Sequence, residues 1–543
     1  MNAAQLLAQC LENEGVRYVF GVPGEENLAL MDAFLDSPIE FVTTRHEQGA
    51  AFMADLYGRL TGRAGVCLST LGPGATNLMT GVADANLDSA PLVAIAGQAS
   101  THRLHKESHQ VLDLRQMFQP ITKYAAQLLE PEIVPEVVRK AFKLAQVEKR
   151  GACFIEFPEN IADLPAADQP LPVGSPVTPE ASSEVVARAA ERISAARYPM
   201  ILAGNGVVRA GASRALADFA KRLNIPVANT FMAKGVIPFG HPTALGSAGL
   251  QSGDYVNAGF NMADVIICVG YDLVEYHPHL CHPTRDRIII HVDELPAEVD
   301  ASYAIDVGVV GDIEHSLKRL GELAEPHQGE AMRPLRHALI EDMNEHRADR
   351  AFPMKPQKII WDLRTVLDLR DIVVCDVGAH KMWMARMFRC EHPNTCIISN
   401  GFASMGIALP GAIGAKLVHP ERSIVAVTGD AGFLMNGQEL ETAMRLGLSL
   451  VVLIWNDRGY GLIEWKQMNV YGRKSHVDFE NPDFVAYARS FGARGYRLEP
   501  GDDLQAVLRE ALAAQTVTVI DCPVDYSENL KLTEKLGETV VQT

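Results

Sequence analysis

Short runs of apolar, largely β-branched residues alternate with longer amphipathic segments along most of this 543-residue chain. Runs of this length, bounded by glycine or polar residues, predict strands that are buried on both faces, as in parallel sheets. The amphipathic segments between them predict helices. Because strand and helix alternate throughout, the pattern predicts an α/β fold built from doubly wound parallel sheets.

The apolar runs fall into three groups. Residues 1–160 hold YVFGV (18–22), GVCLST (65–70), PLVAIAG (91–97) and ACFIEFP (152–158). Residues 186–330 hold PMILAG (199–204), DVIICVG (264–270) and RIIIHVD (287–293). Residues 356–530 hold DIVVCDVG (371–378), TCIISN (395–400), SIVAVT (423–428), LSLVVLI (448–454) and VTVIDCPVD (517–525). The proline-rich residues 161–185 and the charged residues 331–355 are predicted linkers, so we expect three α/β domains.

Composition and charge narrow the class of protein. Hydrophobic residues make up 48% of the chain and aromatic residues 7%, which is typical of an α/β enzyme. The net charge of −18, from 67 acidic and 49 basic residues, argues against a nucleic-acid partner. The nine cysteines form no CxxC pair, which indicates reduced thiols and a cytoplasmic location. We expect no secretory signal, and no apolar run reaches the roughly 20 residues of a membrane span.

Two aspartates follow two of the predicted strands of the third group. Asp430 comes after the run 423–428, Asp457 comes after the run 448–454, and a helix-length segment separates them. In a right-handed βαβ unit the carboxyl ends of both strands meet at one edge, so the two carboxylates are expected side by side. Carboxylate oxygens suit Mg²⁺, and the small residues 429, 431 and 432 would let backbone N–H groups approach a phosphate. The alternative is a plain Gly-Asp-Ala turn with Asp457 as a capping residue.

Further segments carry a resemblance to a known family. TTRHEQGAAFMADLYGRLTGRAGV (43–66), TLGPGATN (70–77) and the segment 429–457 resemble the thiamine diphosphate (ThDP) enzymes of the acetohydroxyacid synthase and pyruvate oxidase group. Within it, HQVLDLRQMFQPITKY (109–124), VGYDLVEYHP (269–278), SNGFASMGIALPGAIGA (399–415) and PVDYSENL (523–530) resemble catabolic, FAD-independent acetolactate synthases. The family motif is GDG followed by NN. Here Ala431 replaces its third glycine and Asp457 its second asparagine.

The resemblance implies a fold and an activity. It implies an N-terminal pyrimidine-binding (PYR) domain, a central domain and a C-terminal diphosphate-binding (PP) domain. It implies that ThDP and Mg²⁺ support the decarboxylation of pyruvate and its carboligation to a second pyruvate, which gives 2-acetolactate and CO₂. It also implies a homodimer or homotetramer with active sites at the subunit interface, and no membrane partner.

The resemblance also assigns roles to residues. Glu47 would be the catalytic carboxyl group at the pyrimidine ring, Ala403 would offer its carbonyl to the 4′-amino group, and Met405 would separate the two rings of ThDP. Asp430, Asp457 and the carbonyl of Gly459 would bind Mg²⁺. Further cofactor contacts are expected from Gly72, Asn77, Gly378, His380, Gly429, Ala431, Gly432 and Tyr460. The substrate would contact Gln110, Phe118 and Trp465, and Gln110 is also a candidate catalytic residue.

Each assignment has a purely structural alternative. Glu47 could pair with Arg45 or Arg59 on a helix surface, Met405 could be ordinary core, and Gly72 could be a plain turn glycine. These alternatives stay open on the sequence alone.

Two features of the sequence bear on the identity of the substrate and on whether a flavin binds. Glu25 and Glu26 stand where catabolic relatives usually carry a lysine, so the substrate of a 2-hydroxyacyl-CoA lyase, a sulfoacetaldehyde acetyltransferase or an aldehyde ligase is an alternative to pyruvate. Glyoxylate carboligation is disfavoured because that enzyme lacks the glutamate that matches Glu47. A non-catalytic subunit of the same fold is a further alternative. The Tyr271-Asp272 region resembles the flavin-free version, so we expect no FAD.

Overall fold

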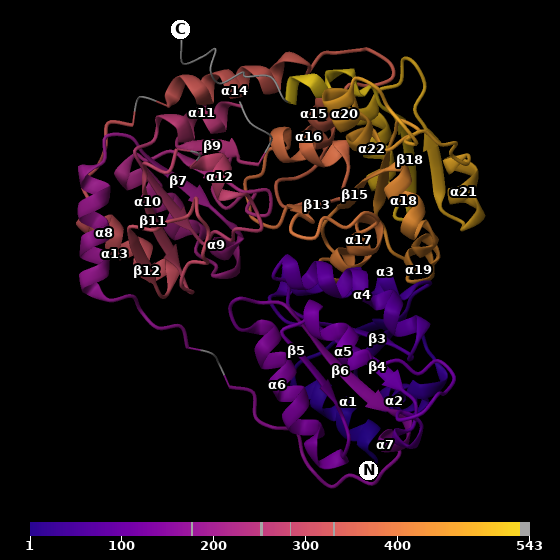
Figure 1. The fold of residues 1–543 in the computed structure, drawn as a ribbon. Coiled ribbons are helices and arrows are strands. Elements are labelled where there is room, and N and C mark those ends of the chain that lie inside the picture. The colour runs from indigo at the N-terminus through magenta and orange to yellow at the C-terminus, as the bar shows by residue number, and fades with distance from the viewer. Residues whose placement is uncertain (175–176, 250–253, 283, 330–331, 533–543) are drawn as a thin grey trace.

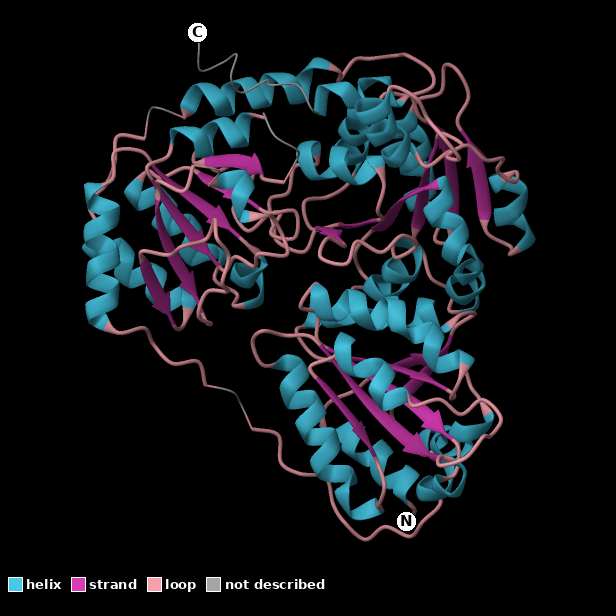
Figure 2. Ribbon diagram, viewed as in Figure 1, coloured by secondary structure: helices cyan, strands magenta, loops and turns pink. Residues whose placement is uncertain are grey.

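Three six-stranded sheets, each entirely parallel, organise the chain (Figure 1). The computed structural model describes residues 1–174, 177–249, 254–282, 284–329 and 332–532. Figure 2 shows helices lining the strands of each sheet. The predicted α/β architecture of doubly wound parallel sheets is therefore confirmed.

The first sheet has the strand order β2-β1-β3-β4-β6-β5. Its strands are β1 (Tyr18–Gly21), β2 (Glu40–Thr43), β3 (Gly65–Ser69), β4 (Leu92–Gln98), β5 (Tyr124–Gln127) and β6 (Ala152–Pro158). Its helices are α1 (Ala3–Asn13), α2 (Leu28–Leu35), α3 (Glu47–Thr61), α4 (Pro73–Leu87), α5 (Leu114–Phe118), α6 (Val134–Gln146) and α7 (Glu159–Ala162). Phe20 lies in a core with α3 and α4, whereas its neighbour Val19 lies in a second core with α1 and α6. Helices thus cover both faces of the sheet.

The second sheet, at the upper left of Figure 1, has the order β12-β11-β10-β7-β8-β9. Its strands are β7 (Pro199–Ala203), β8 (Val227–Asn229), β9 (Ala244–Ser247), β10 (Val265–Val269), β11 (Ile288–Asp293) and β12 (Val307–Val310). Its helices are α8 (Ser183–Ala195), α9 (Asn205–Arg209), α10 (Ser213–Leu223), α11 (Tyr255–Met262), α12 (Pro278–Cys281), α13 (Ile313–Leu323) and α14 (Arg333–Glu345). Helix α14 falls within the predicted linker 331–355, but its Leu335, Leu339 and Met343 are buried in the core of this domain.

The third sheet has the order β14-β13-β15-β16-β18-β17. Its strands are β13 (Ile372–Cys375), β14 (Cys396–Ile398), β15 (Ile424–Gly429), β16 (Val451–Asn456), β17 (Arg494–Arg497) and β18 (Thr518–Pro523). Its helices are α15 (Pro356–Val366), α16 (Ala379–Met387), α17 (Ala408–Val418), α18 (Asp430–Asn436), α19 (Leu440–Arg445), α20 (Gly461–Tyr471), α21 (Phe484–Ser490) and α22 (Leu504–Ala513). This domain lies at the upper right of Figure 1 and contacts both others.

Helices α3 and α17 join the first domain to the third in one continuous core. They approach closely because α17 carries glycines on the facing side: a Cβ added to Gly411 would lie 2.9 Å from Leu56 Cγ. A Cβ added to Gly414 would lie 2.6 Å from the carbonyl oxygen of Met53. Small residues at this crossing therefore set the spacing between the two domains.

Two expectations from composition can be compared with the structure. All nine cysteines are buried and free, as the absence of a CxxC pair predicted. Over the described ranges, we find no helix with the length and apolar character that a bilayer crossing requires.

Candidate functional site

The two predicted carboxylates lie at one edge of the third sheet. Strands β15 and β16 are parallel neighbours, and Gly429 is in register with Trp455. Asp430 follows β15 directly and begins α18, and Asp457 follows β16 directly. The βαβ arrangement expected from the sequence is therefore present, although α18, a 3₁₀ turn at Gly437–Glu439 and α19 replace the single helix expected between the strands.

Hydrogen bonds fix the Asp430 side chain. Its Oδ2 accepts a hydrogen bond from the backbone N–H of Arg458 at 2.7 Å and one from the side-chain amide of Asn481 at 2.7 Å. Burial raises the pKa of Asp430, and burial together with the neighbouring Asp430 carboxylate raises the pKa of Asp457 to about 8. Two buried carboxyl groups that repel each other form a site that a divalent cation would neutralise.

Asn481 is a residue of this edge that the sequence did not reveal. Besides Asp430, its amide donates to Asn456 Oδ1 at 3.1 Å, and its own Oδ1 is buried without a hydrogen-bond partner in the described part of the chain. It lies in a segment without regular secondary structure, which returns to the edge through a bridge between Gly459 and Asp478. No strand or motif marks that segment, so only the tertiary structure places Asn481 here.

His380 lies over the glycines that the resemblance assigned to the diphosphate. A Cβ added to Gly378 would lie 2.7 Å from its Cε1, and one added to Gly429 would lie 3.3 Å from the same atom. Burial lowers the pKa of His380 to about 3, so the imidazole is neutral at physiological pH. Among the described residues its Nε2 is buried without a partner, as expected for an atom that awaits a ligand.

The segment before α17 carries the residues predicted to shape the cofactor. Ala403 has a φ of +57°, in the left-handed region, and half-buried Met405 follows it. The N–H of Gly406 donates to the Asp376 carboxylate at 2.8 and 3.1 Å, and the Gly406 carbonyl accepts from Asn436 at 3.0 Å. Burial raises the pKa of Asp376 to about 6. Asp376 and Asn436 thus fix the backbone of Gly406, the residue directly after Met405.

The pyrimidine candidates gather at the corresponding edge of the first sheet. Glu47 begins α3 and is 9% exposed, and its Oε2 accepts a hydrogen bond from the Asn77 amide at 3.0 Å. Gly72 has a φ of +52°, and a Cβ added there would lie 2.9 Å from the carbonyl oxygen of Gln110. The structure therefore brings Glu47, Gly72, Asn77 and Gln110 to one place. Arg59, the alternative partner of Glu47, instead pairs with Asp55 and two other aspartates.

Glu26 lies close to the same edge. Its carboxylate accepts a hydrogen bond from the Thr70 hydroxyl. The Thr70 methyl group would lie 2.9 Å from a Cβ added to Gly74, and the Glu47 carboxylate would lie 3.3 Å from it. Glu25 is exposed. The carboxylate of Glu26 is thus separated from Glu47 by one side chain, that of Thr70.

The substrate candidates Phe118 and Trp465 are buried in this single chain. Phe118 is fully buried in the first domain and its ring stacks on Phe154 with the centroids 3.9 Å apart. Trp465 lies in α20 and is 5% exposed. Its indole N–H is buried without a partner among described residues. Tyr460, which precedes α20, is 39% exposed. The substrate roles of Phe118 and Trp465 stay predictions.

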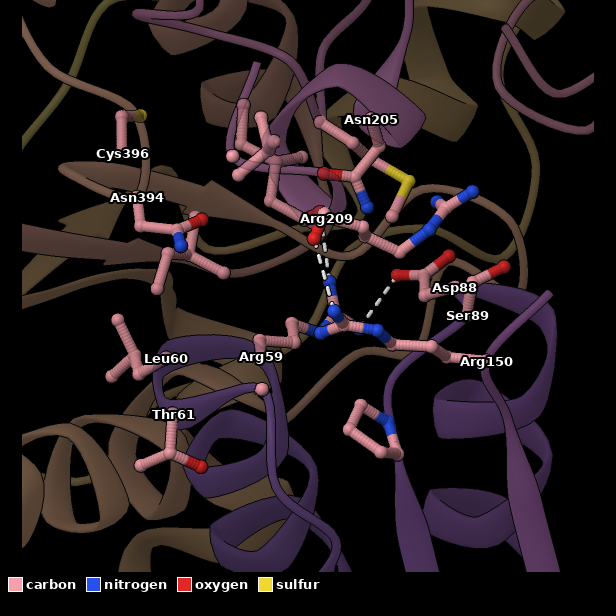
Figure 3. Close-up of a pocket in the computed structure, with 17 residues that line it drawn as sticks. Arg59, Leu60, Thr61, Asp88, Ser89, Arg150, Asn205, Arg209, Asn394 and Cys396 are labelled. Atoms are coloured by element: carbon pink, nitrogen blue, oxygen red, sulfur yellow. Dashed lines mark hydrogen bonds and ion pairs between the residues drawn. The ribbon is translucent and has the colours of Figure 1, made fainter. Parts of the chain in front are cut away.

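A pocket of about 270 Å³ lies elsewhere, where all three domains meet. Figure 3 shows Arg59, Asp88, Arg150 and Arg209 gathered around it. Arg209 pairs with Asp272 at 3.0 Å, in the segment used above to predict the absence of flavin. No motif predicted this pocket, because its lining comes from three separate domains.

Comparison with known proteins divides the chain into the same three domains as the structure. The N-terminal TPP binding domain of thiamine pyrophosphate enzymes matches residues 1–124, the central domain matches 186–320, and the C-terminal TPP binding domain matches 376–522. The chain is 39% identical to an acetolactate synthase of Bacillus subtilis, over 98% of this chain and 96% of the relative.

Two other relatives are nearly as similar. A catabolic acetolactate synthase of Raoultella terrigena is 37% identical, over 97% of this chain and 96% of the relative. A probable acetolactate synthase large subunit of Methanocaldococcus jannaschii is 36% identical, over 98% of this chain and 93% of the relative. Similarity thus extends over both edges described above and the domain between them.

Proposed function

Because the chain belongs to the acetolactate synthase family of thiamine pyrophosphate enzymes, we propose that it joins two pyruvate molecules into 2-acetolactate with release of CO₂. The observation that carries the proposal is that one chain retains both halves of the site. Asp430 and Asp457 stand at one sheet edge, and Glu47 with Asn77 stands at the other. A subunit without chemistry would have no need of both.

The residues present fit ThDP and Mg²⁺. ThDP, when bound, supplies the electron sink that decarboxylation of a 2-ketoacid requires. Asp430, Asp457 and the Gly459 carbonyl would hold Mg²⁺, whose charge would neutralise the two buried carboxyl groups. The unpartnered Nε2 of His380 would face a phosphate oxygen, and it would donate a hydrogen bond there in the neutral tautomer that carries the ring proton on Nε2.

Glu47 would hold the proton shared with the pyrimidine ring. Its carboxylate is nearly buried, and the Asn77 amide fixes Oε2, which leaves Oε1 for the ring nitrogen. Proton transfer by a positioned carboxyl group typically contributes at least about 100-fold to the rate. Met405, held through Gly406, would occupy the space between the two rings.

We also propose that each site combines Glu47 of one subunit with the PP edge of another. Supporting this, large apolar side chains remain exposed around that edge: Phe402, Leu434, Met435, Tyr460, Ile463, Met468, Val470 and Tyr471. Exposed large apolar side chains near a functional site are typical of a subunit interface. A homodimer or homotetramer would bury these side chains.

Complementation tests the shared site. Inactive Glu47→Gln protein mixed with inactive Asp430→Ala protein should regain about a quarter of wild-type activity, since half of randomly paired dimers would hold one intact site of two. If each site lay within one chain, no mixture would recover activity.

We further propose that the enzyme works without FAD. The support is that the Asp272 carboxylate is occupied by two cations of the same chain, Arg209 at 3.0 Å and Lys149 at 2.9 Å. Arg209 also lines the pocket of Figure 3. Protein purified without added flavin should therefore show full activity and no flavin absorbance.

The decisive assay supplies pyruvate, ThDP and Mg²⁺ and measures CO₂ and acetolactate. Glu47→Gln should lower turnover at least about 100-fold while ThDP still binds. Glu40→Gln, which alters an exposed carboxylate of the same domain, is the matched control and should be fully active. Wild-type protein that releases no CO₂ would refute the pyruvate assignment, and an active Glu47→Gln variant would refute the role of Glu47.

One observation favours a second candidate, a ThDP carboligase or lyase whose acceptor carries no carboxylate. Glu26 places negative charge one side chain from Glu47, where it would repel a ketoacid. A screen of aldehydes and 2-ketoacids with wild type and Glu26→Gln distinguishes a pyruvate acceptor from an aldehyde acceptor. If pyruvate is the acceptor, removal of the charge should lower its KM severalfold. If the acceptor is an aldehyde, its KM should not respond to the charge.

A further inference from the structure

Four buried charged groups meet where the first domain contacts the third. Arg59, in the last turn of α3, donates to Asp55 at 2.6 and 3.1 Å, to Asp84 at 3.0 Å and to Asp88 at 2.7 Å. All three carboxyl groups are at most 1% exposed. Three buried carboxyl groups around one guanidinium are costly to desolvate, and their hydrogen bonds must offset that cost.

Two of these aspartates reach into the third domain. Asp84 accepts hydrogen bonds from the Ser399 hydroxyl at 2.7 Å and the Ser404 N–H at 3.3 Å. Asp88 accepts from the N–H groups of Asn400 at 3.1 Å and Gly401 at 2.5 Å. They therefore bind the backbone of the segment 399–404 at both of its ends.

The segment is anchored to the other domains as well. The Arg59 guanidinium donates to the Ile398 carbonyl at 3.4 Å, and the Asn400 side chain donates to the Glu275 carbonyl of the central domain at 2.8 Å. A Cβ added to Gly401 would lie 2.7 Å from Asp88 Oδ1, so the aspartate and the glycine backbone fit closely. All three domains thus meet on this one segment, beside the pocket of Figure 3.

The conformation of this segment matters because of the residues at its end. Ala403 adopts a φ of +57°, which a residue with a Cβ rarely adopts unless the surroundings hold it. Ser399 and Ser404, which donate hydrogen bonds to Asp84, lie before and after Ala403 in the chain, and Ser404 directly precedes Met405. Without these hydrogen bonds the segment would be free to relax to an ordinary backbone conformation and displace the Ala403 carbonyl and Met405.

We propose that Asp84 and Asp88 are positioning residues, which hold the segment 399–404 in the conformation that ThDP binding requires. The proposal rests on the proposed function, because Ala403 and Met405 act only if ThDP binds beside them. It assigns to α4 of the PYR domain a role at the PP edge of its own chain. That role is separate from the role of Glu47 at the pyrimidine ring.

Asp55 provides a matched control. It is as buried as Asp84 and binds the same guanidinium, but among the described residues it makes no hydrogen bond to the segment 399–404. An Asp→Asn change keeps the shape and replaces one acceptor oxygen by a donor. At Asp84 and Asp88 that donor would face an N–H or O–H group of the segment or the Arg59 guanidinium, whereas at Asp55 it would face Arg59 or the Asp84 carboxyl group and no group of the segment.

The test measures the Kd of ThDP in excess Mg²⁺ by calorimetry and the thermal midpoint of the cofactor-free protein, for full-length variants. We expect all three Asp→Asn variants to lower the midpoint. Only Asp84→Asn and Asp88→Asn should raise the Kd at least 10-fold, about 1.4 kcal/mol. An equal increase for Asp55→Asn would show a merely structural role and overturn the proposal.

Ser399→Ala keeps the proposal testable if the Asn variants do not fold. It removes one hydroxyl donor to Asp84 and leaves all four charged groups in place. We expect a severalfold increase in the Kd of ThDP with an almost unchanged midpoint. An unchanged Kd would overturn the proposal. Because the readout is cofactor binding, a wild type that binds ThDP but forms no acetolactate would refute the proposed function and leave this inference intact.

Discussion

Two glycine-to-alanine changes in helix interiors should have opposite effects on stability. In α13, a Cβ added to Gly321 would lie 3.6 Å from Phe219, which is ordinary contact. Alanine there should stabilise the helix by about 0.5 to 1 kcal/mol, because glycine loses more backbone entropy on folding. In α17, a Cβ added to Gly414 would lie 2.6 Å from the Met53 carbonyl oxygen and 3.2 Å from its Cα.

The neighbours of Gly414 are backbone atoms of α3, so no side-chain rotation can relieve the clash. The helices must separate, and overpacking of this kind costs about 1 to 3 kcal/mol, more than the gain in helix propensity. Because the gain in helix propensity is the same at both sites, Gly414→Ala should be less stable than Gly321→Ala by about 1 to 3 kcal/mol. It should also lower activity, because α3 begins at Glu47 and α17 follows Met405 closely.

Hydrogen exchange is the suitable assay, because a chain of three domains need not unfold in one step. Amides of α3 and α17 should exchange faster in Gly414→Ala than in wild type, while those of α13 should exchange more slowly in Gly321→Ala. If Gly414→Ala slowed exchange in α3 and α17, the close approach of these helices would not be the reason for glycine, and the reasoning would be refuted.

Three further predictions concern charge, metal and core. Burial and the nearby Asp55 raise the pKa of Asp84 to about 7, so the folded state holds a proton that the unfolded state releases near pH 4. The stability of wild type relative to Asp84→Asn should therefore fall by about 2 kcal/mol between pH 5 and pH 7, measured by hydrogen exchange of the α4 amides, and a constant difference would contradict the shift. Asp430→Ala should retain at least about 10-fold less ThDP after gel filtration, whereas the control Glu510→Ala, at an exposed carboxylate of the same domain, should retain it fully. Phe118→Ala should lower the free energy of unfolding by about 3 to 5 kcal/mol, and an altered KM for pyruvate at unchanged stability would instead favour its predicted substrate role.

Most central strands were predicted, although the short β8 was missed, and most edge strands were not. ACFIEFP at 152–158 coincides with β6, which is buried along its whole length between two neighbouring strands. By contrast, Arg494–Arg497 forms β17 at the edge of the third sheet, where every residue is at least partly exposed. A buried strand needs a continuous apolar run, whereas an edge strand carries polar residues and so leaves no distinct pattern.

Site residues divide in the same way. Asp430 and Glu47 stand in recognisable motifs directly after a strand or at the start of a helix, so their position followed from the sequence. Asn481 and Asp376 were missed, although both make hydrogen bonds that hold predicted site residues in place. The role of Asn481 depends on how an irregular segment returns to the sheet edge, which neither periodicity nor motif spacing encodes. Asp376 directly follows β13, so the pattern that identified Asp430 could have found it.

Helix α3 limits where the chain can gain or lose residues. Its first residue is Glu47, and Arg59, in its last turn, binds the aspartates at the domain junction. Arg59 is twelve positions after Glu47, which corresponds to about 18 Å along the helix axis. A single inserted residue between them would turn Arg59 by about 100° relative to Glu47 and direct it away from Asp84 and Asp88. Length variation among descendants of this sequence should therefore be absent from α3 and concentrated in exposed connections such as residues 166–174.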